Sequence, residues 1–167
     1  PQVPSGGAYI GMSATYFVYY APLLMRQVAS TSNTVLVIQN GDPARPQNVT
    51  VNFSTAAGSP GNATYSKSLP NIPANSHYYY DLNDETLLPA GWYGSAEISG
   101  GLPIAVVVHI FSGPDTLQTY NALPAQLAAS RWSIPLFASR LNNALSTPVT
   151  IQNISGTQIS AGQIKLE

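Results

Sequence analysis

Few side chains in this sequence could perform nucleophilic catalysis. A Ser/His/Asp catalyst needs a histidine that a carboxylate orients beside a hydroxyl, and the two histidines are His77 and His109. His109 ends an apolar run and His77 precedes three tyrosines, positions typical of strand ends. The aspartates that could orient them are Asp42, Asp81, Asp84 and Asp115. Since the sequence has no Gly-x-Ser-x-Gly or His-Glu-x-x-His motif, it predicts that the protein is not an enzyme.

Metal-binding patterns are equally sparse. Two histidines without short spacing, and no cysteine, exclude a usual zinc site. The run Asp81–Glu85 has enough oxygen atoms for calcium, but it lacks the glycine and the bidentate glutamate of an EF-hand loop. We expect a solvated turn there, with calcium binding as the alternative, and no cofactor.

Two features point to carbohydrate. Four Asn-x-Ser/Thr sequons, at Asn48, Asn52, Asn62 and Asn153, are possible glycosylation sites, although a chain rich in Asn, Ser and Thr produces some sequons by chance. Among the aromatic residues, an exposed pair could stack on sugar rings and make the protein a carbohydrate-binding or adhesion module. The candidates for stacking are Trp92 and Tyr93, although alternate aromatics in strands usually fill the core.

The composition excludes several classes of protein. Only 8% of residues are charged and the net charge is −1, so there is no basic surface for nucleic acid. Ser, Thr, Asn and Gln make up 51 of the 167 residues, and a polar but uncharged surface is common in extracellular β proteins. The sequence shows no signal peptide and no membrane span. Its first residues, Pro-Gln-Val-Pro, suggest an internal segment or a mature form.

Short β-branched and aromatic runs alternate with turn residues along most of the chain. This spacing is the signature of an antiparallel β-sandwich of the immunoglobulin-like, Greek-key type. Residues 123–129 could form one helical turn. The predicted strands are Tyr16–Met25, Thr34–Gln39, Asn48–Ser54, Ala63–Leu69, His77–Leu82, Gly91–Ile98, Ile104–Phe111 and Leu117–Tyr120, with a break at Gly100-Gly101.

A duplication organises these strands. The stretch Pro22–Asn40 occurs again at Pro135–Asn153, 113 positions later and without a gap. Both copies end in Ile-Gln-Asn, and the same offset then matches Val51 with Ile164. A period this long indicates one small domain per repeat. We therefore predict the end of a preceding repeat or a linker strand at 1–16, a complete repeat at 17–129, and the first strands of another repeat at 130–167.

The two copies also predict which face of each strand is buried. Leu36 and Ile38 remain apolar in the second copy as Val149 and Ile151, whereas Val37 is replaced by Thr150. Side chains of a strand alternate between its two faces, so Leu36 and Ile38 point into the core. By the same argument Val51 and Phe53 point inward, while Thr50, Asn52 and Ser54 point outward.

Several short motifs occur in a fixed order along the chain. They are Pro22-Leu23-Leu24, the Ile-Gln-Asn segment, Leu88-Pro89-Ala90-Gly91-Trp92-Tyr93-Gly94-Ser95-Ala96, Leu102-Pro103-Ile104-Ala105-Val106 and Tyr120-Asn121-Ala122. Over nearly all of residues 17–167 this order resembles the tandem β-sandwich repeats of large secreted surface proteins of filamentous bacteria, an uncharacterised repeat family. The resemblance implies an extracellular, structural or adhesive role and supplies no catalytic residues.

The partial repeat carries apolar side chains whose partner strands are absent from it. They are Ile134, Leu136, Phe137, Val149, Ile151, Ile164 and Leu166. Leaving such side chains in water forfeits about 1.5–3 kcal/mol each, so a following repeat, or a neighbour's strands through donor-strand complementation, must cover them. We therefore expect a structural protein of a cell-surface fibre, sheath or stalk. Its expected partners are copies of itself and possible surface polysaccharide, without nucleic acid or a membrane span.

Overall fold

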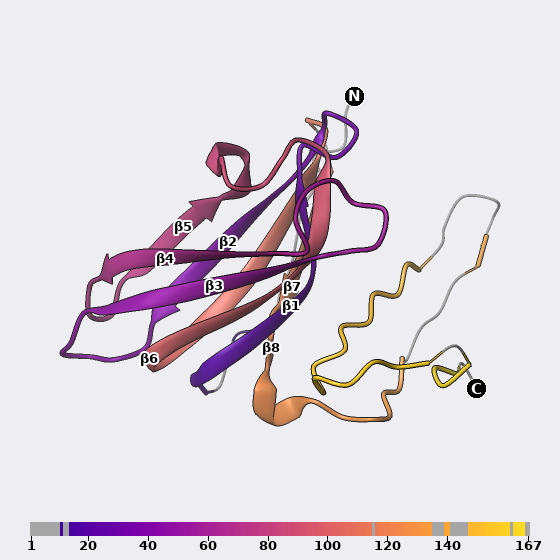
Figure 1. Cartoon of the computed structure of the whole chain (residues 1–167). Coiled ribbons are helices and arrows are strands. Elements are labelled where there is room, and N and C mark those ends of the chain that lie inside the picture. Colours follow the sequence, from indigo (N-terminus) through magenta and orange to yellow (C-terminus); the bar gives the residue numbers. More distant parts are fainter. Residues whose placement is uncertain are drawn as a thin grey trace. The chain divides into compact units, whose positions relative to one another are not determined.

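The computed structural model describes residues 11, 14–114, 116–134, 139–140, 147–160 and 162–165 (Figure 1). The chain divides into two compact units, Pro1–Ser130 and Arg131–Glu167, which we call the body and the tail. Most of residues 1–16 lie outside the described residues, and so does the predicted end of a preceding repeat.

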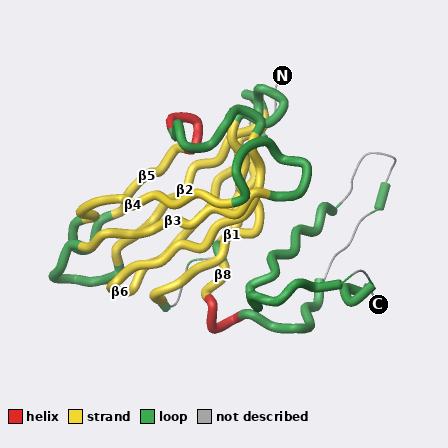
Figure 2. Tube along the Cα trace, viewed as in Figure 1, coloured by secondary structure: helices red, strands yellow, loops and turns green. Residues whose placement is uncertain are grey.

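The regular secondary structure of the described part of the body is β-strand except for two short 3-10 turns, as Figure 2 shows. This confirms the all-β class. The predicted strands are found, with ends that differ by a few residues. The elements are β1 (Tyr16–Arg26), β2 (Ser32–Asn40), β3 (Gln47–Thr55), β4 (Thr64–Ile72), β5 (His77–Asp81), η1 (Leu82–Asp84), β6 (Trp92–Ser112), β7 (Leu117–Asn121), β8 (Leu123–Pro124) and η2 (Ala125–Leu127). Residues 123–129, expected to form a helical turn, contribute the unpredicted β8 as well as the 3-10 turn η2.

All described strand pairs are antiparallel, and β6 belongs to two groups of strands. Its first half pairs with β1 and β3, which give the order β4-β3-β6-β1-β8. Its second half pairs with β2 and β7, and β5 pairs with β2. Both sides of each half of β6 are therefore occupied by strands of the body itself.

The predicted break at Gly100-Gly101 lies inside β6, which runs without interruption from Trp92 to Ser112. β1 and β2 are joined by a tight turn with an antiparallel bridge between Val28 and Ser32. Since β1 and β2 run in opposite directions and each pairs antiparallel with a different half of β6, the two halves of β6 also run in opposite directions. The chain thus reverses within β6, at Gly100–Pro103, where the sequence predicted a break.

The core forms between the two groups of strands. Leu36, Ile38, Val51 and Phe53 are buried, as the duplication predicts, while Asn52 and Ser54 are exposed and Thr50 is half-buried. An aromatic contact joins the two groups, because the centroid of the Phe53 ring on β3 lies 6.3 Å from that of Tyr80 on β5, and the Trp92 ring lies 5.6 Å from Phe53 within the first group.

The motif residues Leu23 and Tyr120 meet at an irregularity in β1. The register of β1 against β6 shifts between Ala21 and Leu24. There the Tyr120 hydroxyl donates to the carbonyl oxygen of Leu23 at 2.5 Å, and the Leu23 N–H donates to the hydroxyl at 3.3 Å. Burial raises the pKa of Tyr120, so the hydroxyl keeps its proton and satisfies both backbone groups of the bulge.

The tail differs from the prediction of further strands. Its described residues, among them 147–160, contain no strand. A strand needs a hydrogen-bonded neighbour. In the body that neighbour is β6, which pairs with β1, β2 and β3. Residues 131–167 contain no counterpart of β6.

Candidate functional site

The tail exposes the apolar side chains that the sequence assigned to an interface. Ile134, Val149, Ile151 and Ile164 are 44%, 41%, 56% and 52% exposed. Leu136, Phe137 and Leu166 lie outside the described residues. The offset of 113 also matches Trp132, which is exposed, with the buried Tyr19. Sequence reasoning overlooked Trp132, although the same offset would have identified it.

The counterparts of these side chains in the body are fully buried. Ala21, Leu36, Ile38 and Val51, which match the four exposed residues at the same offset, have no measurable exposure. The two copies therefore have the same apolar pattern but opposite burial.

Asn40, the last residue of the duplicated Ile-Gln-Asn, is the centre of a buried polar network. Its Nδ2 donates to the carbonyl oxygens of Arg45, Ile72 and Pro73 at 2.9–3.1 Å. Its Oδ1 accepts from the Asp42 N–H at 3.0 Å and from Gln47 Nε2 at 2.8 Å. One side chain thus holds together the loops 41–46 and 73–76, and a buried amide with all its partners is costly to remove.

Gln47 extends this network to the reversal of β6. Its Oε1 accepts from the Leu102 N–H at 2.9 Å, and Gly41 donates to the Pro103 carbonyl oxygen at 2.8 Å. A Cβ on Gly100 would lie 2.6 Å from Gln47 Oε1, so this position requires glycine. The network therefore fixes three chain connections at one end of the body.

Asp42 completes this network with a charge. Its carboxylate accepts from Arg45 Nη2 at 2.7 Å, Arg45 Nε at 3.2 Å and the backbone N–H groups of Ala44 and Arg45. The hydrogen bonds from Arg45, followed by that from the Ala44 N–H, lower the pKa of Asp42 to about 2. The group is therefore ionised at any physiological pH.

Asn153, the counterpart of Asn40, forms the same local turn without the burial. The Ser155 N–H donates to Asn153 Oδ1 at 3.0 Å, and the Asp42 N–H donates to Asn40 Oδ1 in the same way. In both copies the donor lies two residues after the asparagine. Asn153 Nδ2 donates to the carbonyl oxygen of Thr157 at 2.6 Å. The side chain is exposed. Sequence reasoning treated Asn153 only as a sequon, although a polar residue kept in both copies beside a core position was a signal of this structural role.

The structure contradicts the sugar-stacking hypothesis for Trp92. Its side chain has no exposure, because it packs edge-on against Phe53 and its Nε1 donates to Thr55 Oγ1 at 2.9 Å. Tyr93 is half-buried and its hydroxyl donates to the Ala57 carbonyl oxygen. Trp92 and Tyr93 differ in burial because they are consecutive residues of β6, and consecutive side chains of a strand point to opposite faces. The pair therefore cannot form a flat exposed platform.

All four sequon asparagines are exposed. Asn48 Oδ1 accepts from the Asn71 N–H at 2.9 Å, and Asn52 Oδ1 accepts from Ser66 Oγ at 2.8 Å. Both lie on the outward face of β3, as predicted. Glycosylation of Asn48, Asn52, Asn62 and Asn153 stays a prediction.

The predicted solvated turn at Asp81–Glu85 is only partly solvated. Asn83 and Asp84 are exposed, but Glu85 is 3% exposed, because its carboxylate accepts from the Tyr80 hydroxyl at 2.6 Å and from Lys67 Nζ at 3.0 Å. Burial alone would raise the pKa of Glu85, but these bonds and that from the Leu87 N–H lower it overall. The Glu85 carboxylate therefore links β5 to β4, because Tyr80 lies on β5 and Lys67 lies on β4.

The histidines lie apart from a catalytic arrangement with Asp81. His109 Nδ1 is 3.0 Å from Thr119 Oγ1. Asp81 and His109 are both paired with Val35 from opposite sides, which puts them two strand spacings apart, about 10 Å. Within the part of the chain that the structure describes, no three His, Cys, Asp or Glu side chains gather around a possible metal position. No helix there is long and apolar enough to cross a membrane.

Comparisons with known proteins give information on the fold only. No family model and no curated protein matches the chain. The crystal structure of Thermotoga maritima 1070 is similar over 68% of this chain and 97% of that one, with a TM-score of 0.54 and 13% sequence identity. Over that part of its length the chain therefore shares its fold with a solved protein of distant sequence.

Proposed function

We propose that this protein is a structural component of an extracellular fibre, sheath or stalk, built from β-sandwich repeats of immunoglobulin-like, Greek-key type. The observation that carries the proposal is the opposite burial of the two copies. Ile38 is buried in the body, and its counterpart Ile151 is exposed in the tail. The uncharged polar composition supports an extracellular location.

The energy at stake is comparable to the stability of a domain. Burying the exposed half of four such side chains is worth roughly 3–6 kcal/mol, against about 5–15 kcal/mol for a whole domain. The turn at Asn153 supports the proposal, because it repeats the hydrogen bond from the N–H two residues later that the body forms at Asn40, the end of its second strand.

In the described part of the body, the positions equivalent to the strands expected in the tail are already occupied by β1, β2 and β3, while β4, β5, β7 and β8 each pair with one strand only. Both sides of each half of β6 are paired, and the matched core positions are fully buried. We infer that the strands that complete the tail are those of a further repeat, equivalent to β4–β8, rather than the body of a second copy.

The test is an extended chain in which residues 55–129 are repeated after Glu167, the counterpart of Ser54. The chain has no cysteine, so single cysteines report accessibility. We expect Ile151→Cys to react rapidly with a thiol reagent in the original chain and to be protected in the extended chain. The matched control is Gln152→Cys, whose counterpart Gln39 is exposed, and which should react in both. Equal reactivity of both cysteines in the extended chain, without a second unfolding transition, would contradict the proposal.

A further inference from the structure

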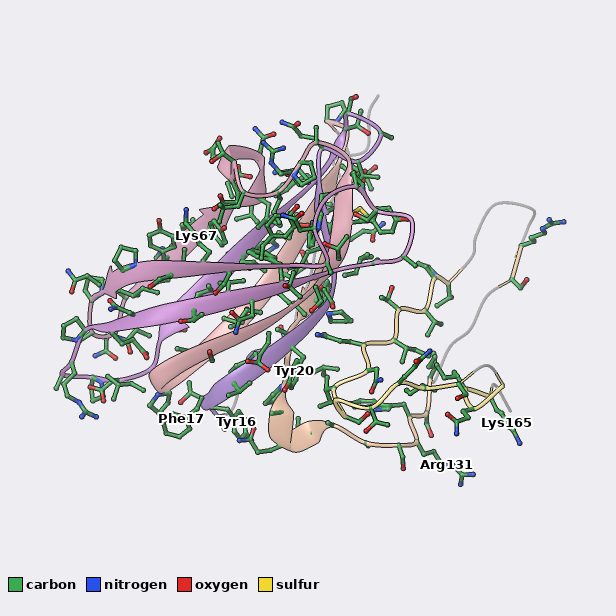
Figure 3. All side chains as sticks on the ribbon, in the orientation of Figure 1. Tyr16, Phe17, Tyr20, Lys67, Arg131 and Lys165 are labelled. Atoms are coloured by element: carbon green, nitrogen blue, oxygen red, sulfur yellow. The ribbon has the colours of Figure 1, made fainter. Side chains whose placement is uncertain are left out.

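The first and last described strands of the body, β1 and β8, lie side by side. β8 pairs antiparallel with the first part of β1, through Tyr19 with Pro124 and Tyr20 with Leu123. Continuing this register toward Tyr16 on one strand leads to η2 on the other, and η2 contacts β1. Figure 3 labels Tyr16 and Phe17 at the start of β1, beside the short coil of η2.

The loops fixed by Asn40 and Gln47 lie at this same end. A Cβ on Gly41 would lie 2.9 Å from Thr15 Cγ2 and 3.0 Å from the Pro103 carbonyl oxygen. Thr15, which precedes β1, therefore packs against loops 41–46 and 100–103. We call this end of the body the terminal pole, formed by residues 14–16, these two loops, loop 73–76 and η2.

We propose that tension along the chain opens the body by peeling β8 and β1 from the terminal pole, rather than by shearing its sheets. This rests on the proposed function in taking the protein to transmit tension, but the geometry is that of the body alone. The first contacts on the path are the pair of Tyr16 with Ile104 at the start of β1 and the two residue pairs between β1 and β8, followed by the five pairs between β6 and β7.

The expected consequence is a low resistance to stretching. A single backbone hydrogen bond contributes little to stability, and a force applied to adjacent strand ends breaks such bonds one pair at a time. A force applied to opposite ends of paired strands loads all their bonds together. The protein would therefore act as an extensible element of a surface fibre rather than as a rigid one.

Single-molecule pulling on the full chain tests this through pairs of introduced cysteines. Ala14→Cys with Ala128→Cys pulls at the terminal pole from both ends of the body. Ala14→Cys with Thr116→Cys is the matched control, because the turn that contains Thr116 lies at the opposite pole, where Gly113 donates to Thr31 and β6 ends. We expect the first pair to unfold the body at a several-fold lower force. All three positions are exposed, and equal chemical denaturation midpoints will show that both variants fold.

A cross-strand disulfide gives a second readout. Tyr20→Cys and Leu123→Cys lie opposite each other in the β1–β8 pair, within the range that a disulfide spans. When this disulfide is formed in the variant pulled at residues 14 and 128, the increase in length that accompanies unfolding of the body should disappear. Reduction of the disulfide should restore it. Equal unfolding forces for the two pulling geometries, or failure of this disulfide to form, would overturn the inference. Either result is independent of whether the extended chain folds.

Discussion

The two copies of the duplicated stretch show how much of a β-structure depends on its partners. Residues 22–53 form strands around a dry core, and their apolar side chains at positions such as Leu36 are fully buried. The described part of residues 135–166 has the same spacing of apolar residues, yet it contains no strand and exposes Val149 and Ile151. The difference lies in β6, which pairs with all three opening strands of the body and has no counterpart in the tail.

The largest contrast should come from matched core truncations. We expect Ile38→Ala to destabilise the body by about 2–5 kcal/mol, because it leaves a cavity in a close-packed core. The matched Ile151→Ala should change the stability of the body by less than about 0.5 kcal/mol, since its side chain is exposed. Denaturant unfolding of both variants measures the difference. Similar losses for the two variants would mean that the copies are energetically equivalent, contrary to the comparison.

The second-largest contrast in stability should come from Asn40 and its counterpart Asn153. Asn40→Ala removes five hydrogen-bond contacts from a buried site and leaves the partner groups unsatisfied, which we expect to cost about 2–3 kcal/mol. Asn153→Ala breaks an exposed turn and should cost under about 0.5 kcal/mol. In the extended chain the cost of Asn153→Ala in the second unit should rise toward that of Asn40→Ala. If it did not, the second copy would not reproduce the network.

The smallest effect is the dependence of stability on acid pH. The pKa of Asp42 is about 2 in the folded body, against 3.8 for an ordinary aspartate. A carboxyl group whose pKa is lower in the folded state stabilises the fold at pH values above its pKa in the unfolded chain. This contribution is lost as the pH falls toward its pKa in the folded state. We expect the unfolding midpoint to fall between about pH 4 and about pH 2.

The Asp42→Asn variant provides the control for this titration. Its unfolding midpoint should change less over the same pH range, with the remainder due to Glu85, whose pKa is also lowered. An unchanged slope in the variant would show that Asp42 does not contribute. The tail has no counterpart of this carboxylate, because Ser155 stands at the matched position.

Much of the fold was predictable because it depends on local patterns. Alternation and turn residues indicated the strands of the body, and the duplication alone assigned Leu36, Ile38, Val51 and Phe53 to the core. The errors occurred where a residue's role depends on distant partners. Trp92 was a candidate for sugar stacking, but it packs against Phe53, and Glu85 was expected in solvent, but it lies beside Lys67 and Tyr80.

By itself, the sequence determined the inward face of the opening strands of the body and predicted a repeat with a period of 113 residues, because these follow from comparing residues at a fixed offset and from the two-residue period of a strand. The tertiary structure alone decided which copy is folded around a core, how Asn40 and Gln47 together join three connections, and that β1 begins and β8 ends at one pole. These properties arise from contacts between residues far apart in the chain, and no local pattern encodes which strands will be present to make them.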